Sequence, residues 1–180
     1  NGYVWTMGAN DQGQLGIGNL TATALPQKIA VDNDGNPFTN VQSIVAFFTR
    51  NTDNGFFAVK EDGSLWAWGS LIGGMRGNGT DSASADSFAL RPIQIKMPGG
   101  RKIKQIVSGN LAVALCTDGT VWTWGPTPGT NLGYSMSGTQ YQTPHQLTGL
   151  SGITQVAGGG TFNYALGGGR VLYGWGQYGH

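Results

Sequence analysis

The chain has 180 residues, a formal net charge of +1 and 32 glycines. Only 11% of the residues are charged, against roughly a quarter in an ordinary soluble domain, while 39% are hydrophobic and 11% aromatic. This composition excludes an intrinsically disordered chain, which lacks aromatic residues and carries a high net charge.

The first predicted element is an aromatic strand followed by a loop rich in glycine, and the aromatic strand returns three times. The four strand candidates are Tyr3–Gly8, Ser64–Gly69, Thr120–Gly125 and Val171–Gly176. Their closing glycines lie about 50 to 60 residues apart, a spacing in the range of propeller repeats. Long loops rich in Gly, Ser, Thr and Asn follow the first three strands and cover residues 9–24, 70–90 and 126–143.

Three shorter apolar segments separate each loop from the next aromatic strand. They cover 26–29, 41–45 and 57–59 in the first unit, 92–95, 103–107 and 113–115 in the second, and 144–147, 153–157 and 164–166 in the third. Asp62-Gly63 and Asp118-Gly119 join the last segment to the aromatic strand, and Asp-Gly between two apolar runs is a strong hairpin signal. The third unit has Gly167–Gly169 at this place, which also permits a positive φ. Each unit therefore contains four short strands and shows no helical periodicity.

Four antiparallel strands per repeat predict an all-β fold, a β-propeller of four-stranded blades with about three blades and one extra strand in this chain. We expect one propeller segment over 1–180, with repeats at 9–69, 70–125 and 126–176 and with 1–8 as the last strand of a preceding blade. Apolar residues stand at consecutive positions, so each sheet needs cover on both faces. The side chains expected between blades are those of Trp5, Trp66, Trp68, Trp122, Trp124, Tyr173 and Trp175.

Three blades do not close a propeller, which needs at least about four. Either further blades of the same parent chain complete the ring, or other copies of this chain do. We favour a segment of a longer protein, because the repeat is interrupted at both ends of the sequence. An open arc would leave unpaired strand edges, which are sites of aggregation unless they are covered.

The repeat resembles that of the regulator of chromosome condensation family, whose typical members form seven-bladed propellers. The resemblance is carried by Val4–Gly16, which follows the family pattern apolar-aromatic-x-aromatic-Gly-x-Asn-x-x-Gly-Gln-Leu-Gly, and by Ile103–Gly125. The chain departs from the family at Leu111–Val113, where a histidine is common, and in the loops 71–77 and 126–134. The family's founder is a nucleotide exchange factor for a small GTPase and docks on chromatin, but its charged contact residues have no counterparts in this sequence.

The sequence contains no set of residues typical of catalysis or of a bound cofactor. Cys116 is the single cysteine and lies in an apolar segment, which predicts a buried, inert thiol. The histidines, His145 and His180, have no partners at metal-ligand spacing. No apolar run approaches the roughly 20 residues of a membrane-spanning helix, and the balanced charge argues against nucleic-acid binding. We therefore expect a non-enzymatic protein.

One segment has the spacing of a calcium loop. Asp32, Asp34 and Asn36 would supply the oxygen ligands, but the twelfth position, where an EF-hand has glutamate, is Ser43. A polar turn between strands is the favoured interpretation, and a calcium site is the alternative.

The long loops should gather on one rim of the propeller and form a surface for a protein partner of unknown identity. Small polar residues mixed with aromatic ones are typical of adaptable recognition surfaces. The candidate contact residues are Met75, Phe88, Tyr134, Met136 and Tyr141. We expect a structural or protein-binding module of a larger prokaryotic or viral surface or extracellular protein. The alternative is an intracellular regulator similar to the family's founder.

Overall fold

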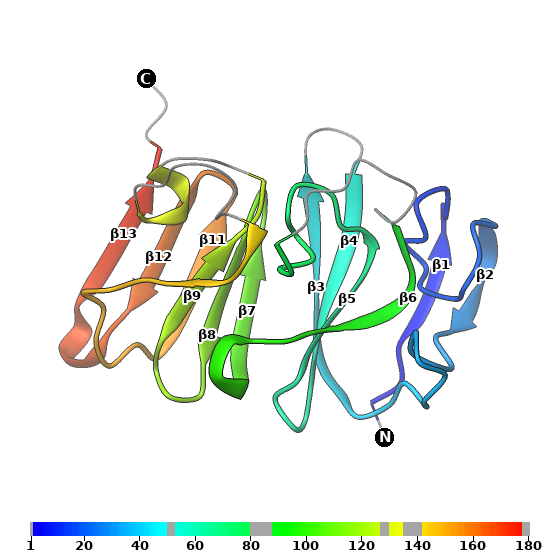
Figure 1. Ribbon diagram of the computed structural model, residues 1–180, viewed down its shortest axis with the longest axis horizontal. Coiled ribbons are helices and arrows are strands. Elements are labelled where there is room, and N and C mark those ends of the chain that lie inside the picture. Colours follow the sequence, from blue (N-terminus) through cyan, green and yellow to red (C-terminus); the bar gives the residue numbers. More distant parts are fainter. Residues whose placement is uncertain (1, 50–52, 80–87, 127–129, 135–141, 178–180) are drawn as a thin grey trace.

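The computed structural model describes residues 2–49, 53–79, 88–126, 130–134 and 142–177, and they form β-strands joined by turns and three short 3₁₀ helices (Figure 1). The strands of this part are β1 (Trp5–Gly8), β2 (Thr23–Lys28), β3 (Val41–Thr49), β4 (Asp53–Lys60), β5 (Leu65–Ser70), β6 (Phe88–Ile95), β7 (Ile103–Ser108), β8 (Ala112–Cys116), β9 (Val121–Trp124), β10 (His145–Gln146), β11 (Gln155–Gly159), β12 (Phe162–Leu166) and β13 (Leu172–Gly176). The helices are η2 (Pro98–Gly100), η3 (Thr130–Leu132) and η5 (Gly168–Arg170).

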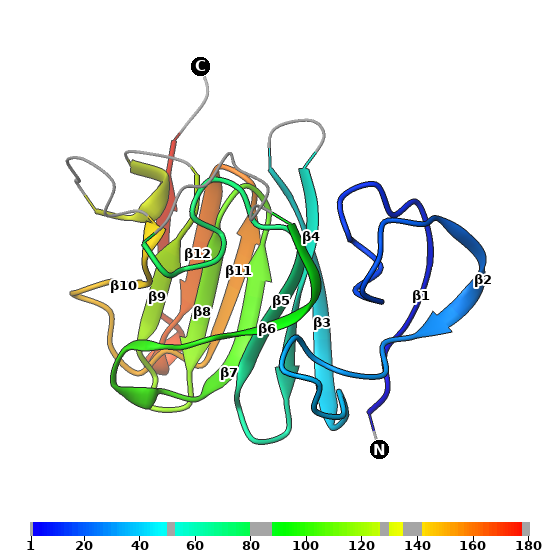
Figure 2. The same ribbon diagram turned by 45° about the vertical axis from the view of Figure 1, so that its right-hand side comes forward.

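The strands form four antiparallel sheets in chain order. Sheet I is β1–β2, sheet II is β3–β6, sheet III is β7–β10 and sheet IV is β11–β13. Figures 1 and 2 show the sheets standing next to one another, and the first strands of sheets II, III and IV are in contact, β3 with β7 and β7 with β11. This arrangement confirms the predicted all-β propeller of four-stranded antiparallel blades.

The sheets and the sequence repeats begin at different points. The strand after each long loop has a proline within it or directly before it. This strand pairs with the aromatic strand before that loop, as in Trp5 with Lys28, Trp66 with Gln94 and Trp122 with Gln146. Among the described strands, sheets I to IV contain two, four, four and three strands. The repeats predicted from the sequence instead place one strand ahead of three sets of four. A repeat can be counted from any point of its period, but hydrogen bonds between strands decide which strands share a sheet.

The tight turns between paired strands depend on the Asp-Gly pairs that predicted them. Gly63 and Gly119 have φ values of 77° and 81°, which favour glycine. In the second turn the N–H and the hydroxyl of Thr120 both donate to Asp118 Oδ1, at 3.0 and 2.6 Å. These hydrogen bonds lower the pKa of the Asp118 carboxyl, so the aspartate stays ionised and fixes the turn.

The indoles of the aromatic strands connect neighbouring sheets. Trp68 in β5 donates from Nε1 to the Gln14 carbonyl in the loop of sheet I, at 3.0 Å, and Trp124 in β9 donates to the Met75 carbonyl in the loop of sheet II, at 3.1 Å. Trp68 is 1% exposed and Trp124 is fully buried, and the Trp124 ring also meets Phe57 edge to face. Each indole therefore contacts the sheet that precedes its own.

The other aromatic side chains that we expect between sheets are buried to different degrees. Trp66 and Trp122 are 9% and 7% exposed, and Tyr173 and Trp175 in β13 are half-buried. The Trp5 side chain is 61% exposed, on a face of β1 beside which the described residues place no sheet. Its expected place between two sheets stays a prediction.

Replacing a buried indole of an aromatic strand should cost far more stability than replacing the exposed indole of β1. We expect Trp124→Ala to lower the free energy of unfolding by about 3–5 kcal/mol, because it leaves a cavity and an unpaired Met75 carbonyl. The matched variant Trp5→Ala should change it by no more than about 0.5 kcal/mol. Urea unfolding in dilute solution, followed by circular dichroism, compares the two. Equal losses would contradict the inter-sheet role of Trp124.

Candidate functional site

The loops that follow the aromatic strands lie together at one end of the sheets. We call this surface the upper rim, and its described parts are residues 9–22, 71–79 and 130–134. These loops stand at the same end of the molecule as the C-terminus (Figure 1). The Asp-Gly turns lie at the opposite end, because paired strands alternate in direction.

The first rim loop is organised by a buried asparagine. Asn10 is 1% exposed, and its Oδ1 accepts a hydrogen bond from the Leu15 N–H at 2.9 Å. Its Nδ2 donates to the carbonyls of Asn19 and Thr21, at 2.9 and 3.1 Å. One side chain thus satisfies three backbone groups at both ends of the loop, which fixes the loop in one conformation.

Two glutamines hold the same loop, and one of them attaches it to the neighbouring sheet. Gln12 Oε1 accepts from the Asn54 N–H in β4 at 3.0 Å, so the loop of sheet I is bound to sheet II. Gln14 Oε1 accepts from the Gln12 N–H at 2.7 Å, and its Nε2 donates to Asp11 Oδ1 at 2.8 Å. The loop is therefore held by polar contacts that do not depend on a bound partner.

The rim loops share two further supports. The Thr6 hydroxyl donates to the Leu15 carbonyl at 2.8 Å, and the Thr123 hydroxyl donates to the Leu132 carbonyl at 2.7 Å. A glycine follows each of these leucines, and a Cβ at Gly16 would stand 2.8 Å from Trp68 Cδ1. The loop can press against the indole only because glycine lies at that position.

The structure places the predicted rim residues in different environments. Met75 is fully buried and belongs to the core, so its assignment to the binding surface is wrong; its loop turns inward and its carbonyl binds Trp124. Phe88 begins β6 and is half-buried. Tyr134 is half-buried against His145, with 4.2 Å between ring centroids, and burial raises the pKa of its hydroxyl. Met136 and Tyr141 lie outside the described residues.

Sequence reasoning missed the polar residues that shape the rim. Asn10 and Gln14 belong to the repeat pattern, but neither they nor Gln12 are among the predicted contact residues. Their signal was present in the sequence, because three amide side chains within five positions of a turn can each bind backbone groups.

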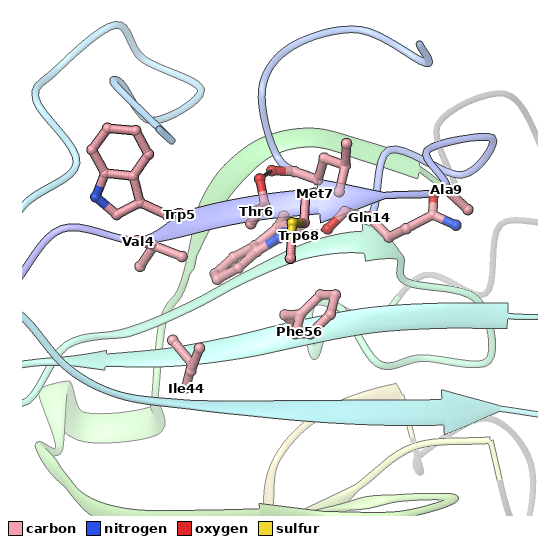
Figure 3. Close-up of a pocket in the computed structure, with 10 residues that line it drawn as sticks. Val4, Trp5, Thr6, Met7, Ala9, Gln14, Ile44, Phe56 and Trp68 are labelled. Atoms are coloured by element: carbon pink, nitrogen blue, oxygen red, sulfur yellow. Dashed lines mark hydrogen bonds between the residues drawn. The ribbon is translucent and has the colours of Figure 1, made fainter. Parts of the chain in front are cut away.

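A pocket of about 310 Å³ opens between β1 and sheet II (Figure 3). Figure 3 shows Ile44 and Phe56 pointing toward β1 with Trp68 beside them, while Trp5 points away. The lining is mainly apolar, and Thr6 and Gln14 are its polar side chains. Among the described residues that line it, none carries an acidic or basic side chain.

The calcium candidate forms a turn. Asp32 is 2% exposed, and its Oδ1 accepts from the N–H groups of Asp34 and Asn36, both at 2.9 Å. The Asn36 side chain donates to Asp32 Oδ2 at 3.5 Å. Across the described ranges, no group of three or more His, Cys, Asp or Glu side chains is placed to hold a metal ion. The Asp32 carboxylate organises the turn, which is the favoured interpretation of this segment.

Cys116 is buried at the end of β8. Burial raises the pKa of its thiol to about 11, despite a hydrogen bond from Thr120 that acts in the opposite direction. In the part of the chain that the structure describes, no helix has the length and hydropathy needed to cross a membrane.

Known proteins are similar to this chain in sequence and in fold. The family described as "Regulator of chromosome condensation (RCC1) repeat" matches residues 1–46. The ultraviolet-B receptor UVR8 of Arabidopsis thaliana is 31% identical over 181 residues, which cover 97% of this chain and 37% of that protein.

Solved structures agree with these sequence matches. Human WBSCR16 is 25% identical with a TM-score of 0.75, over 97% of this chain and 43% of that one. Yeast RCC1 (Prp20) bound to Kap60 is 20% identical with a TM-score of 0.74, over 97% and 40%. A second structure of Prp20 from Saccharomyces cerevisiae, described with its binding to Gsp1p and histones, is 21% identical with a TM-score of 0.68, over 96% and 41%. The chain spans well under half of each of these proteins.

Removing the buried amide of the first rim loop should loosen that loop. We expect Asn10→Ala to lower the free energy of unfolding by about 1–3 kcal/mol, because the Leu15 N–H loses its acceptor inside the protein. The Leu15 amide should then exchange with solvent at least about tenfold faster by NMR hydrogen exchange. Asn33→Ala, at an exposed asparagine, is the control and should leave the Leu15 rate unchanged. An unaltered Leu15 rate in Asn10→Ala would show that the amide does not hold the loop.

The Cys116 thiol should be inert in the folded protein. At pH 8 we expect no reaction with Ellman's reagent until denaturant exposes the thiol, because the folded-state pKa is about 11. The raised pKa also means that this group's contribution to stability is complete below the unfolded thiol's pKa of about 8.5 and is lost as the pH rises toward 11. Rapid labelling of the native protein would contradict both statements.

Proposed function

Because the chain belongs to the β-propeller proteins of the regulator of chromosome condensation repeat family, we propose that it is a non-enzymatic protein-binding module and that its upper rim contacts the partner. The stacked sheets act as the scaffold. The described residues show no arrangement of acid, base and nucleophile that would support catalysis.

The observation that carries this proposal is the order of the first rim loop. A loop that serves only as a connector does not need a buried asparagine and two glutamines to fix it. Asp11, Asn19 and Leu20 are nevertheless exposed on this ordered loop. Since the loop is ordered before binding, the entropy cost of ordering it falls on folding and not on association. A fixed loop with exposed polar and apolar side chains is suited to recognition of a protein surface.

The kind of protein that contains this module is a second part of the proposal. We propose that it belongs to a larger prokaryotic or viral surface or extracellular protein, and its low charge and small polar residues support this assignment. The alternative is an intracellular regulator, which the binding of Prp20 to Gsp1p and histones supports. An assay of nucleotide release from a small GTPase separates the two, because only the regulator would accelerate it.

A charge placed on the upper rim should disrupt partner binding. We expect Leu20→Asp to weaken retention of at least one protein by the immobilised chain about tenfold, as expected for an interface residue worth about 1.4 kcal/mol. Leu20 is 50% exposed, so the fold should tolerate the change. Proteins retained from a cell extract are identified and quantified by mass spectrometry.

The matched control changes the opposite end of the sheets. Glu61→Lys lies at the Asp-Gly turn after β4 and should leave retention unchanged. Retention that survives Leu20→Asp but is lost with Glu61→Lys would place the binding surface at the other end of the sheets.

A further inference from the structure

The three rim loops are structurally equivalent, because a glycine makes the same contact in each. A Cβ added at Gly16, Gly77 or Gly133 would stand within 3.4 Å of the indole of the next sheet, at 2.8, 3.4 and 2.9 Å. The residues directly before and after these three glycines therefore occupy equivalent positions. At both positions the second loop differs from the other two.

The position before the glycine is apolar in the first and third loops and cationic in the second. Leu15 and Leu132 are 4% and 0% exposed, whereas the second loop has the half-buried Arg76. A threonine hydroxyl donates to the carbonyl of each leucine. Sheet II has Ala67 at the register of these threonines, so the hydroxyl has no counterpart there. The second loop thus exchanges an apolar anchor for a positive charge.

The position after the glycine is filled by a large side chain in the first and third loops. Ile17 packs against the apolar core, and the Tyr134 ring lies over His145 of β10. The second loop has the exposed Asn78 at this position, and Ile93 of β6 stands at the register of His145. A short polar side chain therefore replaces a large one beside Ile93.

A pocket of about 300 Å³ lies at this place, between the second rim loop and β6. Both of its walls belong to sheet II, which has four strands and stands between sheets I and III. None of the described residues that line it carries an acidic side chain, and two carry a positive charge. We call it the side pocket, and its residues are Arg76, Gly77, Asn78, Ile93, Gln94, Ile95 and Lys96.

We propose that the side pocket binds a glutamate side chain of the protein that the upper rim contacts, an inference that rests on the proposed function. The Arg76 guanidinium and the Lys96 ammonium supply two positive charges. A planar guanidinium donates two parallel hydrogen bonds to one carboxylate. The amides of Asn78 and Gln94 add further donors at the same pocket.

A side chain suits this pocket better than a free inorganic anion does. The two methylene groups of a glutamate can cover Ile93 and Ile95, whereas inorganic phosphate has no apolar part. Phosphate sites typically use several backbone N–H groups, at the start of a helix or in a nest. The residues that line the side pocket come from a loop and a strand. Their charges and their apolar wall together match an acidic side chain with a short apolar stem.

The side pocket distinguishes sheet II from its neighbours. The stacked sheets repeat one design, so a partner that contacted only the shared features could bind at several equivalent places. A cationic pocket beside one of the three described rim loops favours a single place, because a carboxylate set against an apolar residue at the other loops would lose its water without gaining a charge. The pocket would therefore fix the position of the partner on the rim.

The test uses the purified chain with labelled isoleucine methyl groups and the probe peptide acetyl-Gly-Gly-Glu-Glu-Gly-Gly-amide. Titration followed by NMR should shift the methyl signals of Ile93 and Ile95. The same peptide with glutamine in place of glutamate should bind at least about tenfold more weakly. Binding of the glutamate peptide should also weaken when the ionic strength rises from about 0.05 to about 0.5 M, because salt screens the charges.

Two variants copy residues of the other loops, so the fold should accept both. Arg76→Leu introduces the leucine of the first and third loops and removes one charge. Asn78→Tyr introduces the tyrosine of the third loop, which keeps both charges but fills the pocket. Each should weaken binding of the glutamate peptide at least about tenfold. Lys102→Gln removes an exposed cation beside the Asp-Gly turn at the opposite end of the sheets and should leave binding unchanged.

The outcomes separate this inference from the proposed function. Circular dichroism spectra and melting temperatures like those of the unmodified chain show that the variants are folded. Equal binding of the two peptides, or undiminished binding by Arg76→Leu, overturns the inference. Inorganic phosphate that shifts the Ile93 signal as strongly as the peptide does would assign the pocket to free anions and overturn it as well.

The retention experiment with Leu20→Asp completes the separation. Retention of a protein that depends on Leu20, without any binding of the glutamate peptide, overturns the side pocket alone. Peptide binding that depends on Arg76, without retention that depends on Leu20, supports the side pocket and overturns the role of the first rim loop in the proposed function.

Discussion

The structure depends on apolar contact between sheets that are too thin to cover themselves. A four-stranded sheet of short strands has apolar side chains on both faces, as Val113 and Trp122 show on opposite faces of sheet III. Neither face can be buried within the sheet, so each sheet is stable only against a neighbour. The indoles bridge the gap because they are the largest side chains available and carry one polar group at their edge.

That polar group connects the core with the rim. A buried indole N–H needs an acceptor, and Trp68 and Trp124 find one in the backbone of the rim loops of the preceding sheet. The packing of the next sheet therefore helps to fix the conformation of the loop that faces solvent. The Trp175 Nε1 is buried without a hydrogen-bond partner among the described residues.

The sequence predicts the parts of the fold that depend on local chemistry. The Asp-Gly turns and the aromatic strands have short-range signals, and they lie where they were expected. The grouping of strands into sheets was not predicted, because it depends on hydrogen bonds across the long rim loops. The burial of Met75 was missed for a related reason: methionine suits both a core and a binding surface, and only the inward course of its loop decides between them.

The apolar contacts between successive sheets resemble one another, because each joins buried hydrophobic side chains of two sheets. The polar contacts between sheets differ. Gln12 accepts from the Asn54 N–H between sheets I and II, and the Phe48 N–H donates to the Gly109 carbonyl between sheets II and III. Between sheets III and IV, Gln105 binds both the N–H and the carbonyl of Val156, at 3.0 and 2.9 Å. A sheet displaced from its position on the next would leave these groups without partners, at a cost of about 1–3 kcal/mol each. The shared apolar contact therefore stabilises the array, and the distinct polar contacts fix the position of each sheet on its neighbour.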